Sequence, residues 1–188
     1  ELRGQSDLFA EIRSAAIDQG LPIDTIIKEA APGQFEVNLK HRDDAMAAAD
    51  DTVLLRRLIA QCAHKHGLRA TFMAKPFLEW PGNGMHVHAS IIDANGDNIF
   101  AGEDGDQRLQ HSAAGLLATL KDTLLLYIPG FNGYRRLQAG SYAPTRIAWG
   151  RNNRSVVVRV PASDEKARRL EHRMSGADAN PYFVLAGV

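Results

Sequence analysis

The sequence has one cysteine, no excess charge of either sign and no long apolar run, and each absence excludes a class of protein. Cys62 has no partner, so an internal disulfide is excluded, which suits a reducing compartment. The 22 basic side chains balance 22 acidic ones, so no overall field attracts nucleic acid or an anionic membrane. No apolar stretch approaches the roughly 20 residues that span a bilayer, and the first residues lack a signal-peptide pattern. We therefore expect a cytoplasmic protein without a nucleic-acid or membrane partner.

The length and composition are those of an ordinary globular domain. The chain has 188 residues, of which 45% are hydrophobic, so we expect one core, with two lobes as the upper limit. It begins with Glu1 instead of Met and ends at Val188 within an apolar pattern. We expect it to be a fragment of a longer chain.

Periodicity and turn signals predict an α+β fold in which long helices back a mostly antiparallel sheet. Helices are expected near 6–19, 44–66 and 106–127 and after Pro181. Strands are expected near 22–29, 34–39, 68–77, 84–92, 146–150, 155–160 and 168–174. Residues 131–154 have few periodic signals and many Arg, Asn, Gly and Tyr, which is typical of a functional loop region.

The strand expected at 84–92 places three polar side chains on one face. Side chains alternate along a strand, so His86, His88 and Ser90 point to one side and the apolar residues between them to the other. Imidazoles at this spacing bind metal or phosphate, and the glycines at 82 and 84 let a ligand approach the backbone closely. The alternative is a solvated polar face without a ligand.

Two glutamates flank the turn expected at Pro32-Gly33. If the turn centres on these residues, Glu29 pairs with Glu36, with Cβ atoms roughly 4.5 to 5.5 Å apart. The like charges then repel, and a divalent cation between them would replace repulsion by coordination. Hard oxygen ligands suit Mg²⁺ or Mn²⁺. The alternative is two exposed glutamates on a hairpin, and Pro-Gly is not the preferred two-residue turn.

Arginines are concentrated in the second half of the chain. Strand alternation presents Arg169, Glu171 and Arg173 together. This is either an ion-pair ladder or a metal-binding carboxylate between two guanidiniums, whose planar forks suit phosphate and carboxylate oxygens. An anionic ligand is favoured because further arginines precede this group, namely Arg136, Arg154 and Arg159.

Five groups of residues resemble signatures of the glutamine synthetase family, in the family's order and over nearly the whole chain. They are Glu29-Ala-Ala-Pro-Gly-Gln-Phe-Glu36, Thr71-Phe-Met-Ala-Lys-Pro76, Gly84-Met-His-Val-His-Ala-Ser90, Asn153-Arg-Ser155 with Arg159-Val-Pro161, and Arg169-Leu-Glu-His-Arg173 with Ala179-Asn-Pro-Tyr182. The resemblance implies that residues 1–188 are part of a catalytic domain with a curved sheet. The family's small N-terminal domain and its C-terminal end would lie outside this span.

The resemblance also implies roles for individual residues. Glu29 and Glu36 match ligands of one divalent metal, and His86 and Glu171 match ligands of a second. The positions that match nucleotide contacts are Asp24, His88, Ser90, Arg154 and Arg159. The positions that match contacts to the acyl substrate are Gly82, Arg136, Arg154 and Arg173.

One loop departs from the family pattern. Glutamine synthetases carry a glutamate that binds and deprotonates ammonium in the run Arg-Leu-x-Pro-Gly-x-Glu-Ala-Pro, and this chain has Tyr142 in its place. A neutral phenol is a poor ligand for ammonium, whereas its ring can pack against an alkyl or cationic amine. Two further departures are Pro81 at an asparagine of the glutamate site and Lys28 before the first metal glutamate.

These departures resemble the γ-glutamylpolyamine synthetases, including the γ-glutamylputrescine synthetases. The resemblance implies an ATP-dependent ligase with Mg²⁺ or Mn²⁺ that forms γ-glutamyl phosphate from glutamate and passes the acyl group to an organic amine. It also implies a large homo-oligomer with active sites between subunits, so these 188 residues alone should be inactive. The catalytic residues would be Arg136, Arg154 and Tyr142. Two alternatives stay open: an ammonia-using glutamine synthetase and a non-catalytic scaffold of the same family.

Overall fold

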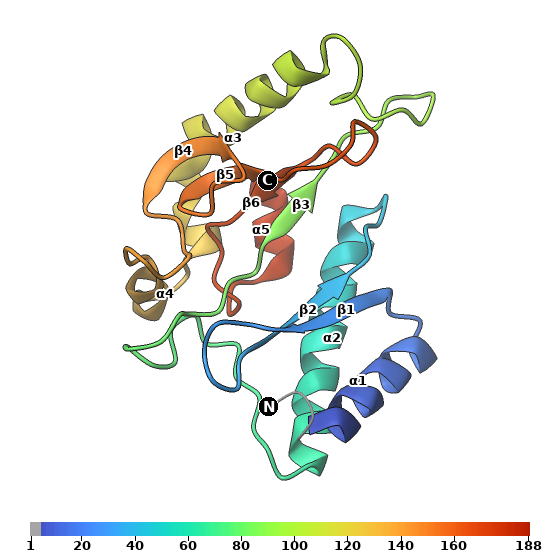
Figure 1. The fold of residues 1–188 in the computed structure, drawn as a ribbon, viewed down its shortest axis with the longest axis vertical. Helices are drawn as coiled ribbons and strands as arrows, with labels where there is room; N and C mark the ends of the chain where they lie inside the picture. Colours follow the sequence, from blue (N-terminus) through green and yellow to red (C-terminus); the bar gives the residue numbers. More distant parts are fainter. Residues whose placement is uncertain (1–4) are drawn as a thin grey trace. The chain divides into compact units, whose positions relative to one another are not determined.

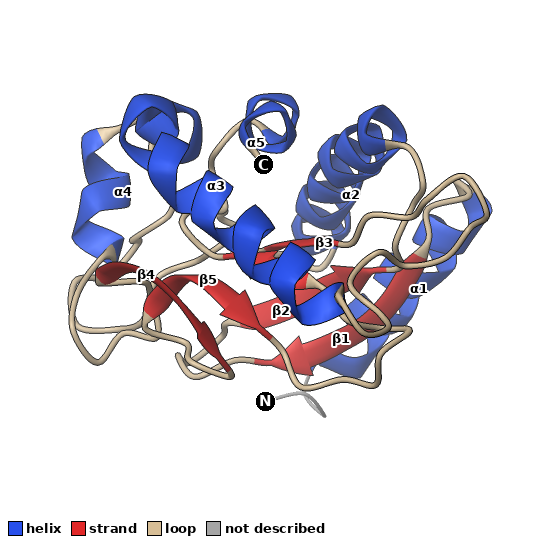
Figure 2. Ribbon diagram, turned by 90° about the horizontal axis from the view of Figure 1, so that it is seen from above, coloured by secondary structure: helices blue, strands red, loops and turns tan. Residues whose placement is uncertain are grey.

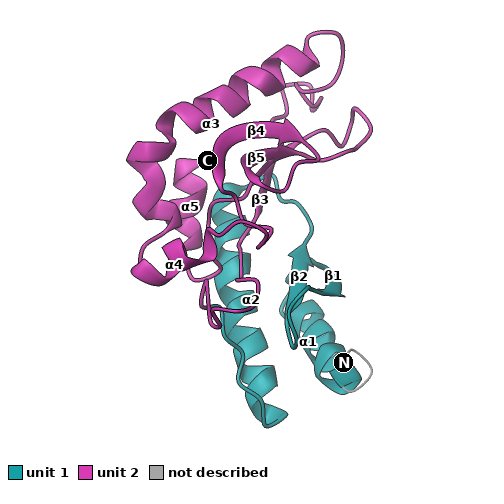
Figure 3. Ribbon diagram, turned by 60° about the vertical axis from the view of Figure 1, so that its left-hand side comes forward, with its two compact units in different colours: residues 1–72 teal, residues 73–188 magenta. Residues whose placement is uncertain are grey.

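The computed structural model describes residues 5–188, which fall into two compact units within residues 1–72 and 73–188 (Figure 3). We refer to them as unit 1 and unit 2, and Figure 1 labels their elements. Two lobes were the upper limit expected from the length. In the part of the chain that is described, no helix has both the length and the apolar character needed to cross a bilayer.

Unit 1 is a β-hairpin packed against two helices. Its elements are α1 (Ser6–Asp18), β1 (Ile23–Lys28), β2 (Phe35–Leu39) and α2 (Ala45–Lys65), and β1 pairs antiparallel with β2. The Asp44 side chain caps α2 by accepting hydrogen bonds from the backbone N–H groups of Met46 and Ala47. A separate hydrophobic cluster holds the unit together, with Leu8, Ile12, Ala16, Leu21, Ile23, Leu55, Leu58 and Cys62 buried in it.

Unit 2 contains a four-stranded sheet in the order β3-β6-β5-β4. Its elements are β3 (Val87–Ala89), α3 (Gly105–Tyr127), α4 (Phe131–Arg136), β4 (Arg146–Arg151), β5 (Val156–Val160), β6 (Leu170–His172) and α5 (Pro181–Gly187). β6 pairs antiparallel with both β3 and β5, whereas β4 pairs parallel with β5. Together with the hairpin of unit 1, this confirms the α+β prediction and its mostly antiparallel pairing.

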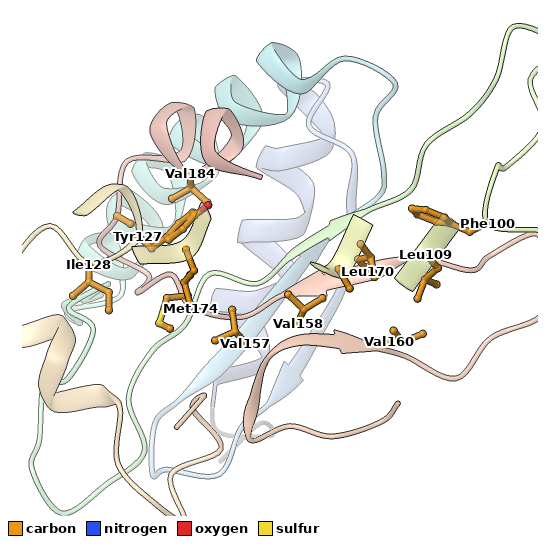
Figure 4. Packing of buried hydrophobic residues seen from close by; sticks show 13 residues of the cluster. Phe100, Leu109, Tyr127, Ile128, Val157, Val158, Val160, Leu170, Met174 and Val184 are labelled. Carbon is orange, nitrogen blue, oxygen red and sulfur yellow. The ribbon is translucent and has the colours of Figure 1, made fainter. Parts of the chain in front are cut away.

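The core of unit 2 lies between this sheet and the helices α3 and α5, which lie on the same side of it in Figure 2. Figure 4 shows Met174 beside Tyr127 of α3 and Val184 of α5, and Leu170 near Leu109 of α3. Because one face of the sheet is filled in this way, the alternate side chains His88 of β3, Arg159 of β5 and Glu171 of β6 are directed to the opposite face. That face carries the candidate site.

Several predicted elements are shorter than expected or absent. The strand predicted at 68–77 does not form: Ala74 accepts a backbone hydrogen bond from Asn83, and Lys75 pairs with the Asn132 side chain, so neither joins a ladder. The strand predicted at 84–92 is regular only over Val87–Ala89. The loop predicted at 131–154 begins with the six-residue helix α4, and Ser6 is the first residue of α1 instead of its cap.

Candidate active site

The centre of the site is Glu171 on β6, a carboxylate that is 2% exposed. Its Oε2 accepts a hydrogen bond from Arg159 Nη1 at 2.6 Å, and its Oε1 accepts one from Arg173 Nη1. A buried charge without a partner is strongly destabilising, and two guanidiniums here supply the compensation. The sequence predicted that Arg169 and Arg173 flank Glu171. The structure corrects one of these partners, because Arg159 of β5 contacts Glu171 where Arg169 was expected.

Strand register explains why these groups meet. Glu171 lies directly opposite His88 of β3 on one side and opposite Arg159 of β5 on the other. Directly opposite residues of antiparallel strands share a face, and residues two positions along share it too, which adds His86 and Arg173. The prediction that the histidine strand has one polar and one apolar face is confirmed, since Met85 and Val87 pack against the core.

His86 contributes a neutral imidazole beside the carboxylate. Its Nδ1 lies 3.2 Å from Glu171 Oε1. Burial, and after it the charges of Arg173 and Arg136, lower the pKa of His86 well below its usual value. At neutral pH the contact therefore joins an uncharged ring to a carboxylate and is not an ion pair, and a neutral imidazole is the form that binds metal ions.

Arg136 ends α4 and is 3% exposed. It donates hydrogen bonds from Nη1 to the Met174 carbonyl at 2.9 Å and from Nη2 to the Arg173 carbonyl at 3.0 Å. Burial, followed by the charge of Arg173, lowers the pKa of Arg136 to about 10, so it stays a cation at neutral pH.

The glycines at 82 and 84 make room for this arginine. A Cβ added at Gly82 would lie 3.0 Å from Arg136 Cγ, and one at Gly84 would lie 2.5 Å from Arg136 Nη2 and 3.0 Å from His86 Nε2. The sequence predicted close approach of a ligand at these glycines. Protein atoms fill that space instead: the Ala74 carbonyl oxygen and Arg136 at Gly82, and Arg136 and His86 at Gly84.

Two buried donors at the site have no acceptor. The Nε atoms of Arg159 and Arg173 are buried and have no hydrogen-bond partner among residues 5–188. Buried N–H groups are nearly always paired, so orphaned donors call for an explanation. An oxygen of a phosphate or carboxylate would satisfy them, and the planar guanidinium suits that geometry. This observation fits the anionic substrates that the sequence implied.

The loop that carries Tyr142 is anchored to Arg136. Ser141 Oγ donates to the Gln138 carbonyl at 2.6 Å and to the Arg136 carbonyl at 3.1 Å. The Tyr142 side chain is 59% exposed. Its backbone has φ of +58°, in the left-handed region, which residues other than Gly, Asn and Asp rarely adopt.

The remaining predicted residues of unit 2 lie on more exposed positions. Arg169 Nε donates to His88 Nδ1 at 3.0 Å, so the fourth arginine of the group faces the histidine strand. Ser90 lies just beyond β3 and is exposed, as is Arg154 in the turn between β4 and β5. The nucleotide contacts of Ser90, His88 and Arg154 stay predictions.

In unit 1 the register of the hairpin corrects one prediction. Glu36 pairs with Ile27, and Glu29 N–H donates to the Gln34 carbonyl, so Glu29 and Glu36 are not directly opposite. The turn spans four residues, with Gln34 N–H donating to the Ala31 carbonyl at 3.2 Å. Alternation still places both glutamates on one face as diagonal neighbours, which typically lie roughly 7–8 Å apart. A cation can bridge long carboxylates at that spacing, so the predicted metal pair stays a prediction.

Unit 1 also carries Asp24, the predicted nucleotide contact on β1. Its side chain is exposed, and its carbonyl accepts a hydrogen bond from Arg13 Nη2 at 2.8 Å. Within the described part of either unit, no three His, Cys, Asp or Glu side chains gather as a metal cluster. His86 and Glu171 together would thus supply two ligands of an ion, and Glu29 and Glu36 would supply two ligands of another.

The buried polar side chains that the sequence did not predict include His172 and Lys75. His172 is 1% exposed, its ring packs 4.3 Å from that of Tyr127, and neither ring nitrogen has a partner in residues 5–188. Burial lowers the pKa of His172 to about 4, so the ring is neutral. Lys75 is 3% exposed. Strand alternation alone places His172 on the core face, whereas no local pattern indicates that Lys75 is buried.

Comparison with known proteins agrees with this geometry. A family model described as "Glutamine synthetase, catalytic domain" matches residues 1–188. The chain belongs to the glutamine synthetase family. Among curated relatives, the γ-glutamylputrescine synthetase PuuA of Escherichia coli is 42% identical over 185 residues, which is 97% of this chain and 39% of that protein. A glutamate–isopropylamine ligase of a Pseudomonas species is 40% identical over 185 residues, covering 96% of this chain and 40% of that protein.

The glutamine synthetase fold extends over the whole described chain. A glutamine synthetase of Pyrococcus woesei is 38% identical over 183 residues, covering 97% of this chain and 41% of that protein. The solved structure titled "GmaS/ADP complex-Conformation 1" superposes with a TM-score of 0.84 at 35% identity, covering 99% of this chain and 45% of that one. The chain therefore spans about two fifths of the length of the curated relatives it matches. The predicted family and fold are confirmed.

Proposed function

We propose that this chain is part of an ATP-dependent ligase that joins glutamate to an organic amine through a γ-glutamyl phosphate. Glutamine synthetase-type enzymes are glutamate–amine ligases that depend on ATP and a divalent metal. The single observation that carries the proposal here is the buried carboxylate of Glu171 between Arg159 and Arg173, both of which keep an unsatisfied Nε donor.

The chemistry explains why such a site needs several cations. A carboxylate does not react with an amine at neutral pH, so it must first become an acyl phosphate. Phosphoryl transfer then needs positioning and charge neutralisation more than covalent help from the protein. Arg159 is proposed to contact the ATP phosphates and Arg154 to contact both ATP and the acyl group. Asp24, His88 and Ser90 are proposed to position the nucleotide.

The acyl substrate is proposed to be held by a second group of residues. Arg136 and Arg173 would bind its carboxylates, and Gly82 would contribute through its backbone. Arg136 is buried and immobilised by two backbone carbonyls, so it can present its charge without reorganising. The orphaned Nε of Arg173 is a donor of the kind a carboxylate accepts.

Two Mg²⁺ or Mn²⁺ ions are proposed as cofactors. Glu29 and Glu36 would hold one, and His86 and Glu171 the other. Bound there, the ions would neutralise negative charge on the phosphates and shield the repulsion between the glutamates. His86 suits the role because its lowered pKa leaves the ring neutral, and the shared face of Glu29 and Glu36 supports the pair despite the corrected register.

Tyr142 is proposed to select an organic amine over ammonium. Its ring is exposed on a loop anchored to Arg136, and it replaces the glutamate that ammonium-using enzymes carry. Relatives named for putrescine and isopropylamine agree with an organic acceptor. An ammonia-using glutamine synthetase is the second candidate, supported by relatives such as that of Pyrococcus woesei.

The complete enzyme is proposed to be a cytoplasmic homo-oligomer in which this chain is one part of each subunit. The 188 residues alone are then expected to lack activity, because the longer relatives contain the remaining parts of the site. The test is phosphate release from ATP by the full-length protein with Mg²⁺ and glutamate, comparing ammonium, putrescine, spermidine and monoamines. Highest turnover with an organic amine supports the proposal. Highest turnover with ammonium favours the second candidate, and ATP binding without amine-stimulated release indicates a scaffold.

A further inference from the structure

The buried Lys75 has an unusual environment for a cation. It is 3% exposed, and its ammonium has one hydrogen-bond partner within residues 5–188, the carbonyl oxygen of Trp80, at 2.5 Å from Nζ. No described carboxylate lies within ion-pairing distance of it. A buried charge is costly unless it is paired, and an apolar side chain of similar size would fill the space at lower cost. A cation at this position therefore calls for a role that an apolar residue cannot fill.

Lys75 lies at the start of a closed loop, residues 75–83, that carries Gly82. The loop ends are joined because Asn83 N–H donates to the Ala74 carbonyl at 2.8 Å and Asn83 Nδ2 donates to the Met73 carbonyl at 2.9 Å. The Asn83 carbonyl accepts from Ala177 N–H at 3.0 Å. Between these fixed ends, the bond from Lys75 Nζ to Trp80 fastens the far side of the loop. A charge-assisted hydrogen bond is stronger than a neutral one, so it restricts the loop well.

The same lysine is fixed to the helix that carries Arg136. Lys75 N–H donates to Asn132 Oδ1 at 2.7 Å, and Asn132 Nδ2 donates to the Lys75 carbonyl at 2.8 Å. Asn132 lies on α4, which ends at Arg136. Gly82 is packed so tightly between these parts that an added Cβ would lie 2.2 Å from the Ala74 carbonyl oxygen. Lys75 and Asn132 thus fix the position of Gly82 relative to that of Arg136.

We infer that Lys75 is a positioning residue for the acyl substrate, acting through the loop it fastens and through α4. The inference rests on the proposed function, in which Gly82 and Arg136 bind that substrate. Lys75 touches neither substrate nor metal. It keeps the backbone at Gly82 and the Arg136 guanidinium at a fixed separation, and misplacing binding groups by about 1 Å has a large effect on their efficiency.

The test compares Lys75→Met, which keeps an unbranched apolar chain and loses the charge, with Lys75→Arg in the full-length protein. Lys75→Met should raise the KM for the acyl substrate about tenfold and leave the KM for ATP and kcat within about threefold, and Lys75→Arg should recover part of the loss. Asn132→Ala, which leaves the Lys75 ammonium in place, should also raise the KM for the acyl substrate. The control is Lys121→Met, an exposed lysine on α3, which should change nothing.

Hydrogen exchange gives a readout independent of activity. The Asn83 amide, bonded to Ala74, should exchange about tenfold faster in Lys75→Met than in the wild type or Lys121→Met. If Lys75→Met and Asn132→Ala both keep the acyl KM within twofold of an active wild type, the inference is wrong and the proposed function stands. If Lys75→Met does not fold, the KM for the acyl substrate is measured in Lys75→Arg and Asn132→Ala. A KM within twofold of the wild type in both variants overturns the inference. A wild type without amine-dependent phosphate release overturns the proposed function, and the inference with it.

Discussion

The guanidinium of Arg173 donates a hydrogen bond from Nη2 to the backbone carbonyl of Tyr142 at 2.9 Å. The same guanidinium contacts Glu171 through Nη1, so one side chain joins the proposed metal ligand to the loop proposed to select the amine. The bond also explains how Tyr142 is kept at φ +58°, because a conformation that costs roughly 1–2 kcal/mol persists only when neighbouring groups impose it. The backbone at this position is held whatever side chain it carries.

Replacing Tyr142 should therefore change selectivity without displacing the loop. Tyr142→Glu should shift the preference from organic amines toward ammonium, because a carboxylate attracts the small cation and an aromatic surface is lost. The measurement is phosphate release with ammonium and putrescine at equal concentrations. Tyr134→Glu, at another exposed tyrosine, serves as the control. An unchanged ratio of the two amines in Tyr142→Glu would refute the role assigned to this ring.

Removing the carboxylate of Glu171 should weaken the fold as well as metal-dependent turnover. Glu171→Ala leaves the buried Arg173 and the partly buried Arg159 without their shared partner, and breaking a buried ion pair typically costs about 3–5 kcal/mol. Glu165→Ala is the matched control, because its side chain is 62% exposed and its ion pair with Arg168 should contribute at most about 1 kcal/mol. Urea unfolding measures both. Equal loss of stability in the two variants would contradict the proposed charge compensation.

The buried ring of His172 leads to the opposite prediction for stability. Its two nitrogens have no partner in residues 5–188, so His172→Phe removes unsatisfied polar atoms and keeps a ring against Tyr127. The expected change is from neutral to a gain of about 1–2 kcal/mol in the free energy of unfolding. His172→Ala should instead destabilise, since it leaves a cavity. A loss above about 2 kcal/mol in His172→Phe would mean that the ring nitrogens are hydrogen-bonded to a group such as water.

Acid should weaken the contact between α1 and α2 in unit 1. Hydrogen bonds from Lys65 and then His66 hold the pKa of Glu11 below its ordinary value of 4.5. The folded-state pKa is the lower one, so the stabilisation is fully present above about pH 4.5 and is lost as the pH falls through the folded-state pKa. An NMR titration of the Glu11 side chain measures this shift. It should disappear in Lys65→Met with His66→Gln, and persistence of the shift there would assign it to another cause.

The sequence predicted the elements with strong periodicity and missed those set by tertiary contacts. The long helices α2 and α3 begin and end within about two residues of their predicted bounds, because each has a long apolar stripe, and α2 also has the Asp44 cap. The strand predicted at 68–77 was wrong. Its backbone groups form hydrogen bonds with a loop and with the Asn132 side chain instead of with a strand. The alternation of apolar residues cannot predict such tertiary hydrogen bonds.

The candidate site shows the same contrast between features set by local periodicity and features set by tertiary contacts. Alternation correctly placed His86 and Glu171 on polar faces, since that depends only on the local period of the strands. It could not identify Arg159 as the partner of Glu171, because the register between β5 and β6 brings them together. The predicted register of the hairpin was wrong for a related reason. A two-residue turn at Pro32 would pair Glu29 with Glu36, whereas the observed four-residue turn pairs Glu36 with Ile27.

The central claim is that two pairs of side chains, Glu29 with Glu36 and His86 with Glu171, each bind a divalent ion in the full-length enzyme. The most direct measurement is anomalous diffraction from crystals of that enzyme grown with Mn²⁺. The account predicts two anomalous peaks, one within bonding distance of the carboxylates of Glu29 and Glu36 and one within bonding distance of His86 and Glu171. The absence of a peak at either pair, or peaks only at other side chains, would contradict it.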